Sequence, residues 1–69
     1  MSEFQQERLT IAELRAKRGK LSQAQLAEEL GTNQTSVSMW EKDIMTISTK
    51  NLYKLCQYFG VSSNKILGW

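Results

Sequence analysis

The 69-residue sequence predicts an all-α fold, a compact bundle of five helices in a single domain. The chain contains no proline and few β-branched runs, and both facts favour helices over strands. Two segments begin with a capping box, in which Ser or Thr is followed three residues later by Gln or Glu. Glycines follow the apolar helical patterns, where a left-handed residue commonly ends a helix.

The first helix is expected from residue 11 to about residue 18. Thr10 and Glu13 form a T-x-x-E capping box at its start, which satisfies two backbone N–H groups. Residues 1–9 are mostly polar and are expected to form a tail or a loosely docked arm. The helical domain itself is then expected to span residues 10–69.

Residues 23–40 are expected to form two short helices joined by a tight turn, and the rest of the chain is organised around them. Gly31 ends the first helix of this pair, because glycine adopts the left-handed conformation without steric cost. The second helix of the pair is expected at about residues 34–41. Its large apolar residues, Val37 and Trp40, are spaced to share one face, and we expect that face to be buried.

A fourth helix, capped by Ser48 or Thr49, and a fifth helix at residues 64–67 complete the expected fold. Ile66 and Leu67 are expected to close the core from the fifth helix. The fourth helix carries four residues with the i, i+3, i+4, i+7 spacing of a buried stripe: Leu52, Leu55, Cys56 and Phe59.

The composition argues against an enzyme. Histidine is absent, Asp43 is the only aspartate and Cys56 is the only cysteine. A Ser-His-Asp triad, a Cys-His pair and a zinc cluster therefore cannot be assembled. Cys56 lies among apolar neighbours and reads as a small core residue, with a reactive thiol as the alternative. We expect no catalytic activity, no cofactor and no small-molecule substrate.

No apolar run approaches the roughly 20 residues that span a membrane, and the N-terminus lacks a signal-peptide pattern. We therefore expect a cytoplasmic protein. The net charge of +2 is only mildly basic, and alone it is weak support for a nucleic-acid partner. The distribution of cations matters more, because four of them cluster just before residue 22: Arg15, Lys17, Arg18 and Lys20.

The outward face of the third helix is polar without being acidic. It carries amide, hydroxyl and thioether side chains at Gln34, Thr35, Ser38 and Met39. A Gln side chain can pair bidentately with adenine, and Ser and Thr hydroxyls adapt to several bases. These four residues are candidate readers of base edges. The alternative is an ordinary solvated helix face.

The spacing of small and branched residues favours the first interpretation. Counting Gln23 as position one, Ala27 is fifth, Gly31 ninth, Val37 fifteenth and Trp40 eighteenth. A small fifth residue lets two helices approach closely, and a glycine at the ninth makes the turn. Over roughly residues 10–68 the sequence resembles the helix-turn-helix of phage repressors, Cro proteins and Xre-like regulators.

This resemblance implies a sequence-specific DNA-binding transcriptional regulator, most simply a repressor. The third helix would enter the major groove and the second would cross the backbone. Gln34, Thr35 and Ser38 would read bases, and Met39 would offer van der Waals contact. The resemblance also implies a homodimer on double-stranded DNA with a two-fold symmetric operator.

Phosphate contacts are expected where the second and third helices begin and from nearby cations. Backbone N–H groups and the helix dipole make a helix N-terminus attractive to phosphate. The residues expected to hold phosphates are Ser22, Gln23, Asn33, Lys42 and Lys50. The resemblance further implies a structural ion pair between Arg15 and Glu41, with two solvated charges as the alternative.

The segment after the third helix departs from the family, which commonly has glycine and basic residues there. Asp43 is expected to keep the left-handed conformation of that glycine. Ile44 and Met45 can cover the core, contact a partner or lie against the sugar backbone. Trp69 is either a lid on the core or an exposed patch. These apolar residues favour the alternative function, a protein-interaction module such as an antitoxin-like partner or an adaptor. A purely structural helical bundle is a further alternative.

Overall fold

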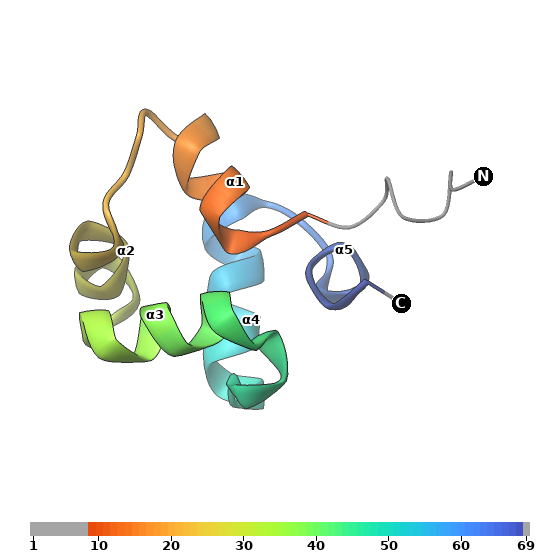
Figure 1. Ribbon diagram of the computed structural model, residues 1–69. Helices are drawn as coiled ribbons and strands as arrows, with labels where there is room; N and C mark the ends of the chain where they lie inside the picture. The colour runs from red at the N-terminus through yellow and green to blue at the C-terminus, as the bar shows by residue number, and fades with distance from the viewer. Residues whose placement is uncertain (1–8, 69) are drawn as a thin grey trace.

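In the computed structural model, the described part of the chain is residues 9–68, and it contains helices and no strands (Figure 1). The elements are α1 (Ile11–Lys17), α2 (Gln23–Leu30), α3 (Gln34–Lys42), the 3-10 turn η2 (Ile44–Thr46), α4 (Thr49–Phe59) and α5 (Ser63–Leu67). The predicted all-α bundle of five helices is confirmed. None of these helices combines the length and the apolarity needed to cross a bilayer. The expectations for residues 1–8 and for Trp69 lie outside the described residues.

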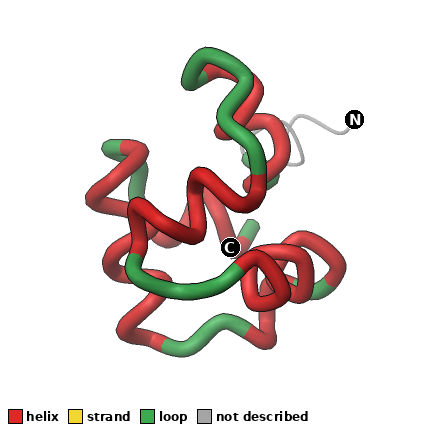
Figure 2. The backbone as a smooth tube through the Cα atoms, turned by 90° about the vertical axis from the view of Figure 1, so that its left-hand side faces the viewer, coloured by secondary structure: helices red, strands yellow, loops and turns green. Residues whose placement is uncertain are grey.

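The helices α2 and α3 form a pair at one side of the molecule, and Figure 2 looks from that side. The other helices support this pair. In the view of Figure 1, α4 lies behind α1 and α3, and it packs against α2. α1 packs against α3, while α5 packs against α4 and η2. The position of α3 is therefore fixed by contacts with α1, α2 and η2.

Reciprocal hydrogen bonds set the starts of α1 and α2. Thr10 Oγ1 accepts from the Glu13 N–H at 3.1 Å, and the Glu13 carboxylate accepts from the Thr10 N–H at 2.9 Å. Ser22 and Gln25 form the same reciprocal pair, at 3.0 and 2.9 Å. Both predicted capping boxes are present, and each satisfies two N–H groups near its helix start.

Single side chains cap α3 and α4. Asn33 Oδ1 accepts from the Ser36 N–H at 2.9 Å, and Ser48 Oγ accepts from the Asn51 N–H at 3.2 Å. Of the two cap candidates for α4, Ser48 is therefore the cap, and Thr49 is the first helical residue.

The turn between α2 and α3 is closed at Gly31, which is left-handed with φ of 73°, as predicted. The following Thr32 N–H donates to the Ala27 carbonyl at 2.9 Å, a bond typical of a glycine-ended helix. Lys54 Nζ, from α4, donates to the carbonyl of Leu30 at 3.3 Å. The end of α2 thus has partners both along the chain and across the fold.

One cluster of buried apolar side chains joins all five helices and η2. Val37 and Trp40 are 0% and 4% exposed, so their predicted burial is confirmed. They anchor α3 to the rest of the fold. The buried cluster consists of Ile11, Leu14, Leu26, Ala27, Leu30, Val37, Trp40, Ile44, Leu55 and Ile66.

The buried stripe of α4 is narrower than its spacing predicts. Leu55 is fully buried, whereas Leu52, Cys56 and Phe59 pack against the core but are only half-buried. In α5, Ile66 is buried while its neighbour Leu67 is half-exposed rather than enclosed. The stripe of α4 is incompletely covered because α5 is short: α5 has 5 residues and α4 has 11. A helix of that size is only about 7.5 Å long, so it cannot cover the whole face of α4.

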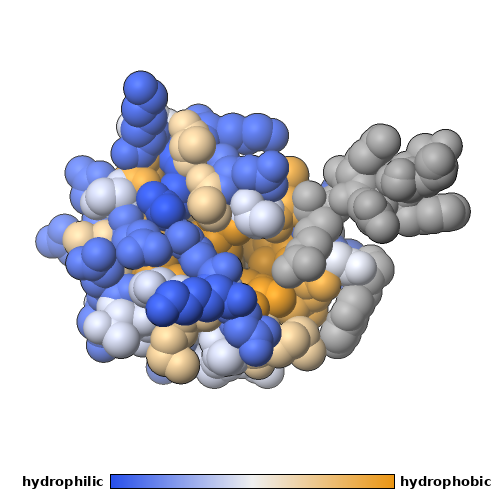
Figure 3. Space-filling model, in the orientation of Figure 1, coloured by the Kyte–Doolittle hydropathy of each residue, from blue (hydrophilic) through white to orange (hydrophobic). Residues whose placement is uncertain are grey.

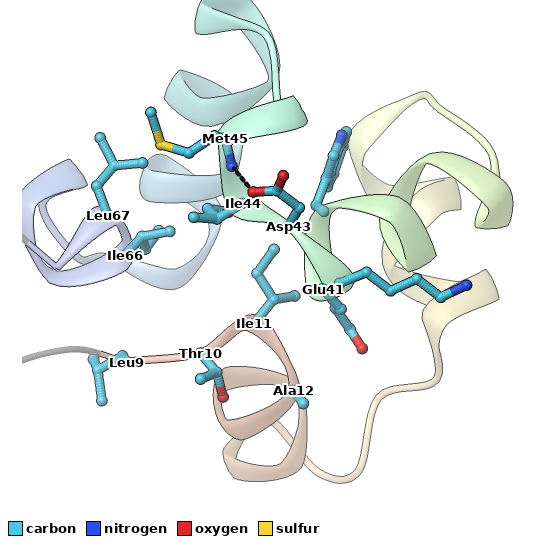
Figure 4. Close-up of a pocket in the computed structure, with 12 residues that line it drawn as sticks. Leu9, Thr10, Ile11, Ala12, Glu41, Asp43, Ile44, Met45, Ile66 and Leu67 are labelled. Carbon is cyan, nitrogen blue, oxygen red and sulfur yellow. Dashed lines mark hydrogen bonds between the residues drawn. The ribbon is translucent and has the colours of Figure 1, made fainter.

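The prediction that Asp43 is left-handed is wrong. Its backbone is extended, with φ of −151°, and its carboxylate accepts from the Met45 N–H at 3.1 Å (Figure 4). Asp43 therefore acts as the N-cap of η2, a role that requires extended backbone. The turn directs Ile44 inward, between Ile11 and Ile66, so Ile44 covers the core. Met45 points outward and is 62% exposed.

Candidate nucleic-acid interface

The outward face of α3 carries the four candidate base readers side by side. Gln34 and Thr35 are exposed, Met39 is 51% exposed and Ser38 is half-buried. Because Val37 and Trp40 hold the opposite face in the core, these side chains point away from the fold. They line one shallow hollow together with a residue from α2 and a cation from the end of α3; the lining residues are Gln23, Gln34, Thr35, Ser38, Met39 and Lys42.

This hollow offers hydrogen-bonding groups from α2 and α3 and a cation at the end of α3. The amides of Gln23 and Gln34 and the hydroxyls of Thr35 and Ser38 can both donate and accept. Lys42 supplies the positive charge that a phosphate requires. The surface therefore combines base-edge chemistry with one phosphate-binding group.

Glu41, near the end of α3, links this helix to α1 and to α2. Arg15 Nε donates to Glu41 Oε2 at 2.7 Å, and Arg15 Nη2 donates to Glu41 Oε1 at 3.2 Å. The expected ion pair is present and is bidentate, the stronger geometry for an arginine and a carboxylate. Both side chains are shielded, at 19% and 15% exposure. Arg15 Nη1 also donates to the Leu21 carbonyl at 2.8 Å, so the pair also fixes the chain entering α2.

Gln23 has a role that its expected phosphate contact did not include. Its Nε2 donates to Glu41 Oε1 at 3.0 Å. Its Oε1 accepts from Gln34 Nε2 at 3.4 Å. The side chain of Gln23 therefore bridges the ion pair and the first candidate base reader. No short motif could indicate this, because Gln23 and Glu41 are 18 residues apart.

The remaining phosphate candidates do not converge on the same hollow. Ser22 and Asn33 use their side-chain oxygens to cap α2 and α3, at 3.0 and 2.9 Å. Lys50 is exposed in the first turn of α4. These residues lie at three different helix starts, so the structure brings only Gln23 and Lys42 of this group beside the candidate readers.

The charges elsewhere divide between structural and solvent-facing positions. The guanidinium of Arg18 lies 4.6 Å from the centre of the Tyr58 ring and donates to the Tyr58 carbonyl, so Arg18 ties α1 to α4. Lys17 and Lys20 are exposed near the end of α1. Two carboxylates of α2 instead line a separate hollow, with α4, away from the outward face of α3: Glu28 and Glu29.

A second hollow lies where α1, the end of α3, η2 and α5 meet, and most of the residues that line it are apolar (Figures 3 and 4). Its floor includes Ile44 and Ile66, with Met45 and Leu67 at one side. It holds no candidate base reader, so it is distinct from the hollow on α3.

Cys56 lacks the surroundings of a reactive thiol. It is half-buried on α4, and burial raises the pKa of its thiol above the ordinary value of 9.0. A raised pKa leaves little thiolate near neutral pH, and the thiolate is the reactive form. These features favour the role of a small core residue.

The comparisons with known proteins agree with this geometry. The family model described as Helix-turn-helix (HTH_3) matches residues 11–66, from the first residue of α1 into α5. No curated protein and no solved structure matches the sequence. The matched segment contains the α2–α3 pair, the buried anchors Val37 and Trp40, and the polar face opposite them. The chain therefore belongs to the Cro/C1-type, Xre-like helix-turn-helix family of DNA-binding domains.

Proposed function

We propose that this protein is a transcriptional regulator, most simply a repressor, that reads an operator in the major groove with α3. The observation that carries the proposal is the two-sided nature of α3. Val37 and Trp40 are buried, while Gln34, Thr35 and Met39 are exposed on the opposite face. A helix held in this way can present its polar face to a groove wide enough for a helix.

Each residue of this face has a proposed role. Gln34, at the first helical position, pairs with adenine through its amide. Thr35 and Ser38 contact base edges with their hydroxyls. Met39 makes van der Waals contact, for example with the methyl group of thymine. Gln23 supports Gln34 from α2 through the 3.4 Å hydrogen bond.

Phosphate contacts position the domain without choosing the sequence. Lys42 is next to the reading face, and Lys50 is exposed at the start of α4. The N-termini of α2 and α3, at Ser22 and Asn33, present backbone N–H groups and the positive end of a helix dipole. Each lysine then adds affinity and salt dependence but little base preference.

A single domain of this size covers about one half-site. We therefore propose that two copies bind a two-fold symmetric operator, with half-sites one helical turn apart, about 34 Å. Occupation of such a site excludes polymerase, which is the simplest form of repression. The protein then acts in the cytoplasm, on the chromosome, as a binding module and not as an enzyme.

The test is selection of a binding sequence from a random duplex pool, followed by polarisation titrations at several salt concentrations. We expect a symmetric site, with a log–log salt slope of about −0.9 for each phosphate contacted. Gln34→Ala should weaken the best site by about 1–3 kcal/mol and relax the preference at one base pair. Gln57→Ala, an exposed glutamine on α4, is the matched control and should change neither quantity. An equal loss for Gln34→Ala on every duplex contradicts base reading.

The hollow between α1, η2 and α5, with apolar side chains exposed at its edge, supports a second candidate, a protein-interaction module. Exposed Met45 and half-exposed Leu67 lie at its edge. Two results together would favour this function over DNA reading. The protein would bind no duplex in a salt-dependent way, and the substitution Met45→Glu would abolish its binding to a protein partner.

A further inference from the structure

The Glu41 carboxylate is a shared acceptor for two different helices. Arg15 from α1 holds it through two hydrogen bonds, and Gln23 from α2 donates to the same Oε1 at 3.0 Å. An ionised carboxylate can only accept hydrogen bonds. The Gln23 amide must therefore turn its NH2 group toward Glu41.

The orientation required of the Gln23 amide in turn constrains the amide of Gln34, the first candidate base reader. With its NH2 group facing Glu41, Gln23 presents Oε1 on its other side. The neighbouring amide group of Gln34 must then be its NH2 group, which donates to Gln23 Oε1 at 3.4 Å. The Oε1 of Gln34 and its second N–H remain for a base.

We propose that Glu41, clamped by Arg15, sets the orientation of the Gln34 amide and so the base pair that α3 accepts at this position. Arg15 and Glu41 are thus positioning residues for specificity, in addition to tying α1 to α3. This inference rests on the proposed reading function of α3.

The amide orientation matters because its two states have nearly the same shape. Exchanging oxygen and nitrogen in a glutamine changes the hydrogen-bond pattern but not the packing. Adenine presents a donor at N6 beside an acceptor at N7, whereas guanine presents acceptors at both O6 and N7. A fixed amide matches one pattern, and an amide free to turn over matches several.

The exposed fractions of these side chains indicate which residues determine the orientation of the Gln34 amide. The side chains of Arg15 and Glu41 are 19% and 15% exposed, so water competes weakly for their hydrogen bonds. Gln34 itself is exposed, and solvent alone does not select one state of its amide. The orientation is therefore imposed from the shielded end of the chain of contacts.

The decisive variant is Glu41→Gln, which has the same shape but can both donate and accept. The base pair in question is the one at which Gln34→Ala relaxes preference. A bidentate contact there gives a preference of about 5- to 150-fold. In Glu41→Gln we expect that preference to fall to about twofold, with the preferences at other positions unchanged. Glu29→Gln, an exposed carboxylate on α2, is the control for the charge change and should keep the full preference.

A second pair of variants separates orientation from mere stability. In a Gln34→Ala background, Glu41→Gln should have no further effect on base preference. The exchange Gln23→Glu with Glu41→Gln again places an acceptor-only carboxylate beside the Gln34 amide. We expect this double variant to recover the base preference while binding all duplexes more weakly, because a negative charge then lies near the DNA.

The results distinguish failure of the inference from failure of the proposed function. If the wild type prefers no duplex, base reading itself fails. If the wild type is selective and Glu41→Gln keeps its preference, or weakens all duplexes equally, the positioning role is overturned. Nitrogen-15 NMR of the free protein gives an answer without DNA. The side-chain amide resonances of Gln23 and Gln34 should shift in Glu41→Gln and that of Gln57 should not, and an unchanged Gln34 resonance overturns the inference.

Discussion

Lys54 Nζ donates a hydrogen bond to the backbone carbonyl of Leu30 at 3.3 Å, so a side chain of α4 closes the end of α2. The last carbonyls of a helix have no partner within the helix, and a cation there also complements the helix dipole. Leu30 directly precedes the turn into α3. The contact therefore helps to fix the angle at which α3 leaves α2.

Replacing Lys54 by Met keeps most of the side-chain stem but removes the ammonium group. We expect the free energy of unfolding to fall by about 1–2 kcal/mol, measured by urea denaturation. Lys50→Met is the matched control, because Lys50 is exposed on the same helix. It should change stability by less than about 0.5 kcal/mol but reduce the DNA salt slope by about 0.9. Equal stability losses for the two variants would contradict a special role for Lys54.

Gly31→Ala should destabilise the fold through the backbone alone. Among the described residues, an added Cβ would contact only Lys54 Nζ, at 3.9 Å, so space is available. The left-handed conformation, with φ of 73°, costs an L-residue roughly 1–2 kcal/mol. Thermal unfolding should show this loss, and Gly31→Asn should lose less because Asn tolerates the conformation better. A neutral Gly31→Ala would mean that the turn can adopt another geometry.

The unequal burial along α4 predicts unequal mutational costs. Leu55 is 0% exposed, so Leu55→Ala leaves a cavity and should cost about 2–5 kcal/mol. Leu52 is half-buried at the edge of the same helix, and Leu52→Ala should cost clearly less. Chemical denaturation of both variants measures the difference. Similar costs would show that the stripe is as wide as its spacing suggests.

The Thr10–Glu13 capping box should make the stability of the fold depend on pH. The backbone N–H of Thr10, and then its hydroxyl, hold the pKa of Glu13 below its ordinary value of 4.5. Because the pKa is lower in the folded state, the stabilisation is present above pH 4.5 and is lost as the pH falls through the folded value. The advantage of wild type over Glu13→Gln should therefore shrink as the pH is lowered below 4.5. Melting temperatures of wild type and Glu13→Gln across this pH range test the prediction, with Glu28→Gln as the control. A stability difference between wild type and Glu13→Gln that grows as the pH falls would contradict the predicted direction.

The sequence was sufficient for features that depend on a few neighbouring residues. Examples are the two capping boxes, the glycine turn at Gly31 and the inward spacing of Val37 and Trp40. Each of these features depends on residues that are at most four or five positions apart in the sequence. Local hydrogen bonds and helical periodicity determine such features, and the structure has them as predicted.

The sequence was insufficient where the outcome depends on what another part of the chain covers. Asp43 became an extended cap because Ile44 is drawn into the core between α1 and α5. Leu52 and Phe59 have the right spacing for burial, but the helices within residues 9–68 leave both side chains half-buried. The bridging role of Gln23 required knowing that α2 and α3 bring it to Glu41.

The hydrogen-bonded chain from Arg15 to Gln34 divides the outward face of α3 into a constrained part and a free part. Within residues 9–68, the side chains of Thr35 and Met39 make no hydrogen bond to the scaffold beneath them, so mutation there can alter the preferred target at little cost to folding. Gln34 is linked through Gln23 to α2 and through Glu41 and Arg15 to α1. A different residue at position 34 would face hydrogen-bonding groups that are arranged for an amide. Under natural drift, descendants of this protein should acquire new targets first through positions 35 and 39, with changes at 34 accompanied by changes at 23 or 41.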